Sequence, residues 1–239
     1  MSKTLALSTR ELKAYLYSPI AYVVMAVFLV ITGIFFGRED FRPGEPAEMR
    51  AFFVWANYVL VFVIPILTMR LVSEEKSSGT IETLMTAPVT DSQVILGKFL
   101  GALVFTAIMI LVTGINVVLI YALGSPDAGP IACGYLGLLL VAAVYISVGL
   151  LASTCTRFQL VSALISLVVL AVMTFLAYYL GFHAEGWMRR ALWFIGFQVR
   201  YENFIKGMLP LADVIYFLSI TAVSLFLSVK VLESRKWRT

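Results

Sequence analysis

The chain has 239 residues, of which 61% are hydrophobic and 13% are charged, and its formal net charge is +4. Soluble domains are about half apolar and about one quarter charged. This composition therefore excludes an ordinary soluble protein and predicts an integral membrane protein, with a single domain over residues 1–239 as the expectation for this length. The sequence contains no basic patch interleaved with aromatic residues, so no nucleic-acid partner is expected.

The first predicted element is an amphipathic helix within residues 1–19 that lies along the membrane surface. Ser8 and Glu11 have the spacing of a capping box, which would start this helix. Leu12 and Tyr15 fall three residues apart on its apolar face, and a proline then ends it. Two roles remain open for this interfacial helix: a flanking membrane anchor, or a lever that also contacts a cytoplasmic partner.

Six later segments are long and apolar enough to cross a bilayer as helices, because a span needs roughly 20 mostly apolar residues. The predicted spans are residues 20–37, 52–69, 94–123, 131–153, 160–180 and 214–232. They are too long and too uniformly apolar for the alternating strands of a membrane barrel. Since backbone groups in lipid must be satisfied within a helix or a closed barrel, the predicted fold is an all-α bundle.

An even number of spans places both termini on one side of the membrane. If that side is the cytoplasm, eleven of the 18 Lys and Arg residues lie inside, and seven lie outside among eight acids. The positive-inside rule therefore predicts that both termini are cytoplasmic.

The cores of the predicted spans lack Asp, Glu, Lys, Arg and His, which argues against a proton-coupled transporter. The chain also lacks a P-loop, an H-E-x-x-H motif and a G-x-S-x-G motif, so it is not expected to be an enzyme, and any energy must come from a partner. Uncharged polar residues in or near the spans could hydrogen-bond between helices or line a pathway. They are Asn57, Thr106, Thr113, Asn116, Ser147, Ser162, Ser166 and Thr174.

A polar insert over residues 70–98 interrupts the apolar sequence between the second and third spans. Thr80 can cap a two-turn amphipathic helix within it, and Pro88 ends that helix. Thr90 and Gln93 have the spacing of a second capping box, which would start the third span. A helix of two turns is marginal alone, so we expect it to dock into the bilayer interface or onto a soluble protein.

The last long loop, residues 181–213, mixes aromatic and basic side chains and is predicted to form short outer or re-entrant helices at the membrane interface. Its role remains open between an aromatic belt that anchors the bundle and an outer gate or lip over a pathway.

The run EEKSSGTIETLMTAPVTDSQVILGKFLGAL, residues 74–103, closely resembles the signature segment of ABC-2 type permeases, the membrane subunits of ATP-binding-cassette transporters. Residues 11–24 and 213–238 resemble the gliding-motility-type branch of these permeases. The resemblance implies a half-transporter of the type V exporter kind. Its fold would be an all-α integral membrane protein with six transmembrane helices, an N-terminal interfacial helix and a short cytoplasmic coupling helix.

The same resemblance implies partners and a site. A second permease half, either a copy or a homologue, would pair with this chain, and both would dock on a dimer of cytoplasmic ABC ATPase subunits through the coupling segment, residues 70–93. The residues that carry this ATPase-coupling role by resemblance are Glu74, Glu75, Lys76, Gly79, Thr80, Glu82, Leu84 and Pro88. ATP and Mg would bind to the ATPase, and the chain itself would bind no cofactor or metal.

The predicted function is that of a permease subunit in the bacterial cytoplasmic (inner) membrane, which couples ATP hydrolysis by a separate ATPase to export. The alternative is a mechanotransmitter or membrane anchor that moves no substrate. It would relay ATPase motion to an extracytoplasmic partner through the loop at residues 181–213.

Overall fold

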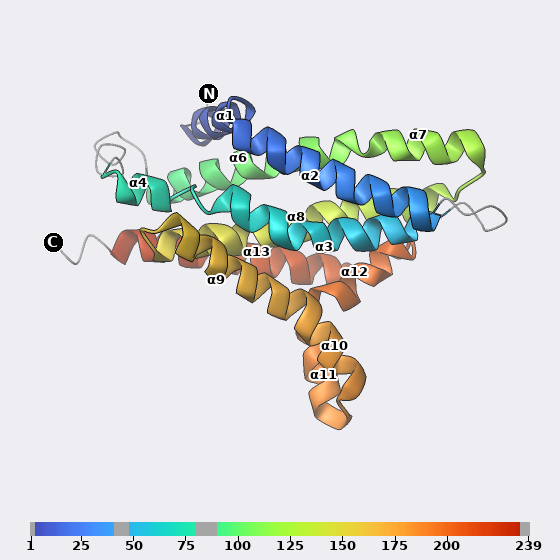
Figure 1. The fold of residues 1–239 in the computed structure, drawn as a ribbon. Helices are drawn as coiled ribbons and strands as arrows, with labels where there is room; N and C mark the ends of the chain where they lie inside the picture. Colours follow the sequence, from blue (N-terminus) through green and yellow to red (C-terminus); the bar gives the residue numbers. More distant parts are fainter. Residues whose placement is uncertain (1–2, 41–47, 80–89, 235–239) are drawn as a thin grey trace.

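The computed structural model describes residues 3–40, 48–79 and 90–234, and within these ranges the chain is largely helical and contains no strand. Its helices are α1 (Lys3–Leu16), α2 (Pro19–Phe35), η1 (Phe36–Asp40), α3 (Arg50–Thr68), α4 (Ser73–Ser77), α6 (Asp91–Val112), α7 (Gly114–Leu123), α8 (Ala128–Cys155), α9 (Gln159–Ala171), η2 (Val172–Leu176), α10 (Ala177–His183), α11 (Gly186–Ile195), α12 (Phe197–Ile205) and α13 (Leu211–Glu233) (Figure 1). The predicted all-α fold is confirmed.

Six helical stretches are long and apolar enough to span a membrane, in agreement with the six predicted spans. These stretches are Pro19–Asp40, Arg50–Ser77, Asp91–Ala122, Ala128–Cys155, Gln159–His183 and Leu211–Glu233. The chain is therefore a multi-pass membrane protein.

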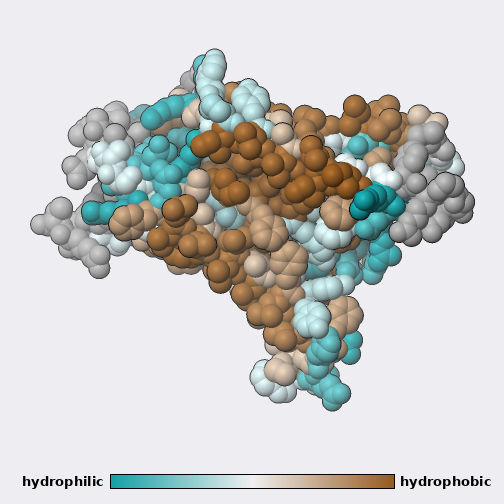
Figure 2. Space-filling model, in the orientation of Figure 1, coloured by the Kyte–Doolittle hydropathy of each residue, from teal (hydrophilic) through white to brown (hydrophobic). Residues whose placement is uncertain are grey.

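Helix α8 lies at the centre of the bundle, and α3 packs beside it. In both spans 67% of the most apolar stretch is buried, against 22–39% in the other four. Two glycines of α8 allow close packing: a Cβ atom at Gly134 would lie 2.5 Å from the ring of Phe53, and one at Gly137 would lie 2.6 Å from Phe204. The more peripheral helices leave apolar side chains at the surface, shown in brown in Figure 2, as expected of helices that face lipid.

The two ends of the bundle differ (Figure 1). Helices α1 and α4, the end of α8, the start of α9 and the end of α13 lie at one end, which we call the α4 end. Helix α7, η1 and the start of α3 lie at the other, the α7 end. Helices α10 and α11 pack against each other and project sideways from the bundle beyond α9.

The third span is not the continuous helix that the sequence predicts, because α6 and α7 meet at Thr113. The Thr113 hydroxyl lies 2.5 Å from the carbonyl oxygen of Ile110, which accepts its hydrogen bond, and 3.1 Å from the hydroxyl of Tyr135. A threonine side chain that bonds the preceding turn competes with the helical ladder and bends helices. Thr32 and Thr106 make similar bonds inside unbroken helices, so the additional contact with Tyr135 of α8 is what distinguishes the position of the break.

The two predicted capping boxes have different outcomes. At the start of α6, the Gln93 amide donates to Thr90 Oγ1 (3.3 Å) and the Thr90 amide donates to Gln93 Oε1 (3.2 Å), so this box is confirmed. The box at Ser8 and Glu11 is wrong, because α1 begins at Lys3 and Ser8 is an interior residue of that helix. Glu11 is instead engaged in a contact with α6, described below.

Candidate functional site

Helix α4 lies near the start of the predicted coupling segment, residues 70–93, of which the structure describes residues 70–79 and 90–93. It carries Glu74, Glu75 and Lys76, and Gly79 follows it with a φ of +71°, a conformation that glycine adopts without steric cost. The other four predicted coupling residues lie outside the described part of the chain, as does the predicted amphipathic helix; they are Thr80, Glu82, Leu84 and Pro88. The ATPase-coupling role of all eight residues stays a prediction.

One side of α4 is attached to the end of α8. The buried hydroxyl of Ser153 accepts hydrogen bonds from the backbone amides of Val72 and Ser73, each at 3.0 Å. Lys76 reaches the same region, where its ammonium donates to the backbone carbonyl of Thr154. Since the last carbonyls of a helix have no partner within it, a lysine there satisfies an otherwise open acceptor. Helix α4 is thus held by hydrogen bonds to the end of the central helix.

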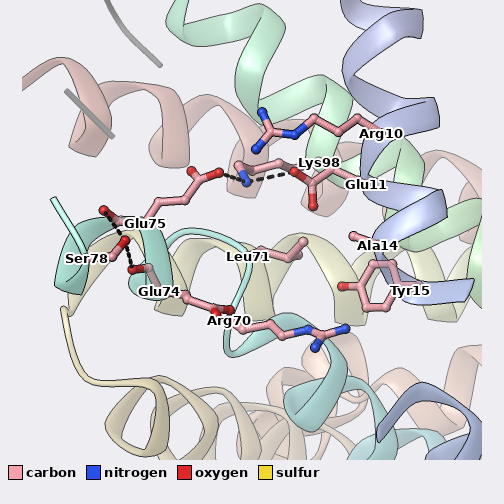
Figure 3. A pocket seen from close by; sticks show the side chains of 10 residues that line it. All are labelled: Arg10, Glu11, Ala14, Tyr15, Arg70, Leu71, Glu74, Glu75, Ser78 and Lys98. Carbon is pink, nitrogen blue, oxygen red and sulfur yellow. Dashed lines mark hydrogen bonds and ion pairs between the residues drawn. The ribbon is translucent and has the colours of Figure 1, made fainter. Parts of the chain in front are cut away.

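The other side of α4 contacts a lysine of α6. The ammonium of Lys98 lies 2.8 Å from Glu75 Oε1 and 3.1 Å from Oε1 of Glu11 on α1 (Figure 3). The Lys98 side chain is 4% exposed, whereas the Glu11 and Glu75 side chains are 14% and 16% exposed. One buried cation therefore joins α1, α4 and α6, and we call these three residues the Lys98 triad.

Sequence reasoning did not find this triad. Lys98 counted only as a positive charge of the inner side, and Glu11 was assigned to a capping box. A signal existed, because Lys98 lies one turn inside the predicted third span, 94–123, where an ionisable residue is expected to have a partner. The partner could not be read from one sequence, since Glu11 is 87 residues away along the chain.

Two glycines of α6 let α1 pack on the helix face beside Lys98. A Cβ atom at Gly97 would lie 2.6 Å from Leu7 Cβ, and one at Gly101 would lie 2.6 Å from Glu11 Cβ. Small residues four apart allow two helix backbones to approach closely, as they do here. The predicted interfacial helix is therefore packed directly on the third span.

A cavity of about 350 Å³ separates α1 from α4 at this end of the bundle. Its lining contains equal numbers of basic and acidic side chains, namely Arg10, Glu11, Arg70, Glu74, Glu75 and Lys98. Figure 3 shows the Lys98 triad on one side of this space and Arg70 on the other. The formal charges of the lining therefore cancel.

Tyr15, near the end of α1, and Arg70, which follows α3, connect α1 and the start of α2 to the end of α3. The Tyr15 hydroxyl donates to the carbonyl of Leu67 (2.8 Å), and the Arg70 guanidinium lies 5.2 Å from the Tyr15 ring centre and donates to Ser18 Oγ (3.1 Å). Burial raises the pKa of Tyr15, and Glu11 raises it further, while Arg70 opposes both effects. Tyr15 therefore stays protonated and remains a hydrogen-bond donor.

A second buried network lies deeper in the bundle and contains no charge. Tyr145 donates to Asn57 Oδ1 (2.9 Å) and lies 2.8 Å from the Thr174 hydroxyl, and Asn57 donates to Gln198 Oε1 (2.6 Å). All four side chains are at most 1% exposed, and they come from α3, α8, η2 and α12. We call them the Asn57 network. For Asn57 and Thr174, the structure favours hydrogen bonding between helices over the lining of a pathway.

The loop at residues 181–213 contains two short helices with opposite exposure. Helix α12 is buried against α8, and its Arg200 pairs with Asp213 at the start of α13 (2.6 Å). Helix α11 has no buried residue, and its Trp187 is 79% exposed. The aromatic loop is thus divided between a part built into the bundle and a part that projects from it.

The comparison with protein families is decisive for the class of this protein. The model of the ABC-2 family transporter protein matches residues 42–228, which is more than half of the chain. The chain belongs to the ABC-2 transporter family. An ABC-2 protein is the membrane component of a transporter, typically non-catalytic itself, and its family implies an ABC ATPase partner and embedding in a membrane.

The assignment to the gliding-motility-type branch stays a prediction for this ABC-2 protein. Residues 11–24, which carry part of that resemblance, precede the matched region, and residues 213–238 extend beyond it. A comparison with curated proteins finds no match.

Proposed function

We propose that this ABC-2 protein is the permease subunit that couples ATP hydrolysis by a separate ATPase to export. One observation carries the proposal: α4, which begins the predicted coupling segment, is attached to α8 by hydrogen bonds and to α6 by an ion pair. A force applied to residues 80–89 by a docked ATPase would therefore reach the membrane helices through fixed contacts. The sequence contains no P-loop of its own, which agrees with an external source of energy.

In this proposal the α4 end of the bundle faces the cytoplasm of a bacterial cell, and the protein resides in the inner membrane. The excess of Lys and Arg in the segments of that side supports this orientation. A second permease half, identical or homologous, pairs with the chain, and each half binds one subunit of an ATPase dimer. ATP and Mg bind to the ATPase.

The mechanism is a shift between two conformations of the permease. ATP binding closes the ATPase dimer, and the closed dimer binds one conformation of the coupling segment better than the other. A ligand shifts a conformational equilibrium only by its difference in affinity for the two states. The ATPase binds residues 70–93 in this proposal, and α4 transmits the resulting displacement to the bundle.

A second candidate function is supported by the exposed helix α11. It projects from the bundle together with α10 and presents the 79% exposed Trp187 and the 49% exposed Met188. Such a surface could bind an extracytoplasmic partner, so that the protein relays ATPase motion without moving a substrate across the membrane.

The first test is association with an ATPase and stimulation of its turnover. The protein is expressed with its candidate ATPase subunits, purified in mild detergent and reconstituted in lipid vesicles. We expect the ATPase to be retained and its turnover to rise, and we expect Leu84→Asp, within the predicted coupling helix, to abolish both effects. The matched control is Ser234→Asp, which adds the same charge at an exposed position of the α4 end that lies just beyond the last apolar span.

Unchanged retention and turnover in Leu84→Asp would contradict the coupling assignment. Vesicles also separate the two candidate functions. ATP-dependent movement of a substrate across the bilayer supports export, whereas ATP-dependent movement of α11 without transport supports the relay.

A further inference from the structure

The two helices that line the cavity at the α4 end are held by different neighbours, and we call α1 with α6 and α4 with the end of α8 two units, although α6 and α8 also contact each other. Helix α1 lies on α6, where Gly97 and Gly101 let the backbones meet. Helix α4 is attached to the end of α8 through Ser153 and Lys76. The cavity of about 350 Å³ lies between α1 and α4, so these two helices are separated by open space at this position.

Lys98 contacts both units at the edge of that cavity. The carboxylates of Glu11 and Glu75 both bind the Lys98 ammonium, at 3.1 and 2.8 Å. The ammonium is almost fully buried, and the buried Oε2 atom of Glu75 has no hydrogen-bond partner among the residues that the structure describes. Moving either carboxylate away from Lys98 would separate it from a cation that is only 4% exposed, which is unfavourable.

We infer that Lys98 is a positioning residue that transmits displacement of α4 to α1 and α6. Because the cation binds both carboxylates, α1 follows α4 when α4 moves. Helix α1 is thus a driven element of the conformational change and not a passive anchor. This inference rests on the proposed function, in which an ATPase moves residues 70–93.

The sharpest variant is Glu11→Met, because it disconnects α1 from the triad and leaves Lys98 and Glu75 as a neutral one-to-one pair. No lone buried charge results, so the fold is not expected to be lost. Glu11→Gln keeps the length of the side chain and one hydrogen-bond acceptor, and provides a second, milder variant. The matched control is Glu233→Met, which removes the carboxylate of an exposed pair with Lys230 at the same end of the bundle.

The measurement is a pair of distances in the permease–ATPase complex, with and without ATP bound to a hydrolysis-deficient ATPase. Spin labels are placed at exposed positions of α1, α4 and α13 by Thr9→Cys, Ser77→Cys and Ser234→Cys, two at a time. The native cysteines are first replaced by Cys133→Ala and Cys155→Ser. Each experiment reports the ATP-dependent change in the α1–α13 or the α4–α13 distance.

We expect ATP to change both distances in the otherwise unsubstituted protein and in Glu233→Met. In Glu11→Met, the change at α4 should persist and the change at α1 should be reduced, because α1 then keeps only its packing on α6 and the Tyr15–Leu67 hydrogen bond; Glu11→Gln should lie between the two. An undiminished change at α1 in both Glu11 variants would overturn the inference and leave the proposed function intact. If ATP moved neither helix in the unsubstituted protein, the proposed function itself would fail.

Discussion

The Lys98 triad and the Asn57 network solve the same structural problem with different chemistry. Each joins helices that are distant in sequence through buried polar side chains, but the triad uses three charges and the Asn57 network uses none. The triad lies at an end of the bundle beside a polar cavity, whereas all four side chains of the Asn57 network are at most 1% exposed. Since desolvation penalises charges far more than amides and hydroxyls, depth in the bundle decides which chemistry is tolerated.

The largest effect is expected from removing the charge that the triad shares. Lys98→Met leaves Glu11 and Glu75 facing each other without a cation, and breaking a buried ion pair in this way costs about 3–5 kcal/mol of stability. Thermal unfolding of the purified protein in detergent measures the loss. Replacing all three residues by Met should restore most of it, because no charge then remains buried; a triple variant as unstable as Lys98→Met would show that packing and not charge dominates.

A smaller effect is expected in the uncharged network. Asn57→Leu removes the partner of Gln198 and one partner of Tyr145, and an unsatisfied buried polar group costs about 1–3 kcal/mol. Hydrogen exchange should show faster opening of α12, which carries Gln198. The double variant Asn57→Leu/Gln198→Leu serves as the control, since it removes both amides; if it destabilised by the sum of the two single variants, the hydrogen bond between them would contribute nothing.

Packing of α1 on α6 can also be disturbed without removing a polar group of either network, at a position that meets the main-chain end of the Glu11 side chain. Gly101→Val introduces a branched side chain where even a Cβ atom would lie 2.6 Å from Glu11 Cβ, and overpacking of this kind costs about 1–3 kcal/mol. Protease protection of α1 measures the expected displacement. Gly114→Val, at a position with no atom near its Cβ, is the matched control. Equal protection in both variants would mean that α1 does not depend on this glycine.

The smallest effect is expected at the exposed ion pair of α13. Lys230→Met should change stability by no more than about 1 kcal/mol, because water screens exposed pairs. The unfolding temperature of this variant should be close to that of the parent protein at both low and high salt. A loss comparable to that of Lys98→Met would contradict the view that burial decides the strength of the triad.

Two features set by local sequence were predicted correctly, the capping box at Ser8 and Glu11 was wrong, and features set by distant contacts were not predicted. Apolar length located all six spans, and the spacing of Thr90 and Gln93 located the start of α6. The break at Thr113 depends on a hydroxyl that also contacts Tyr135 of α8, which no local pattern reveals. The Lys98 triad likewise depends on the packing of α1 on α6, which periodicity alone does not report.

The sequence therefore predicted only part of the candidate site. Resemblance drew attention to Glu75, but it gave no role to Glu11 or Lys98, whose importance comes from their meeting in space. In the Asn57 network the same limit applied to Gln198, which belongs to a loop by sequence and to the buried interior by structure.

The glycine face of α6 has a practical consequence for work on relatives of this protein. The family match starts at residue 42, yet the packed unit starts at Lys3, because α1 lies on Gly97 and Gly101. A chain that begins at residue 42 would lack α1, so the face of α6 around Gly97 and Gly101 would lose its packing partner and Lys98 would lose the carboxylate of Glu11. Boundaries drawn from shared sequence alone would thus cut through a helix contact, and expression trials should keep the first forty residues.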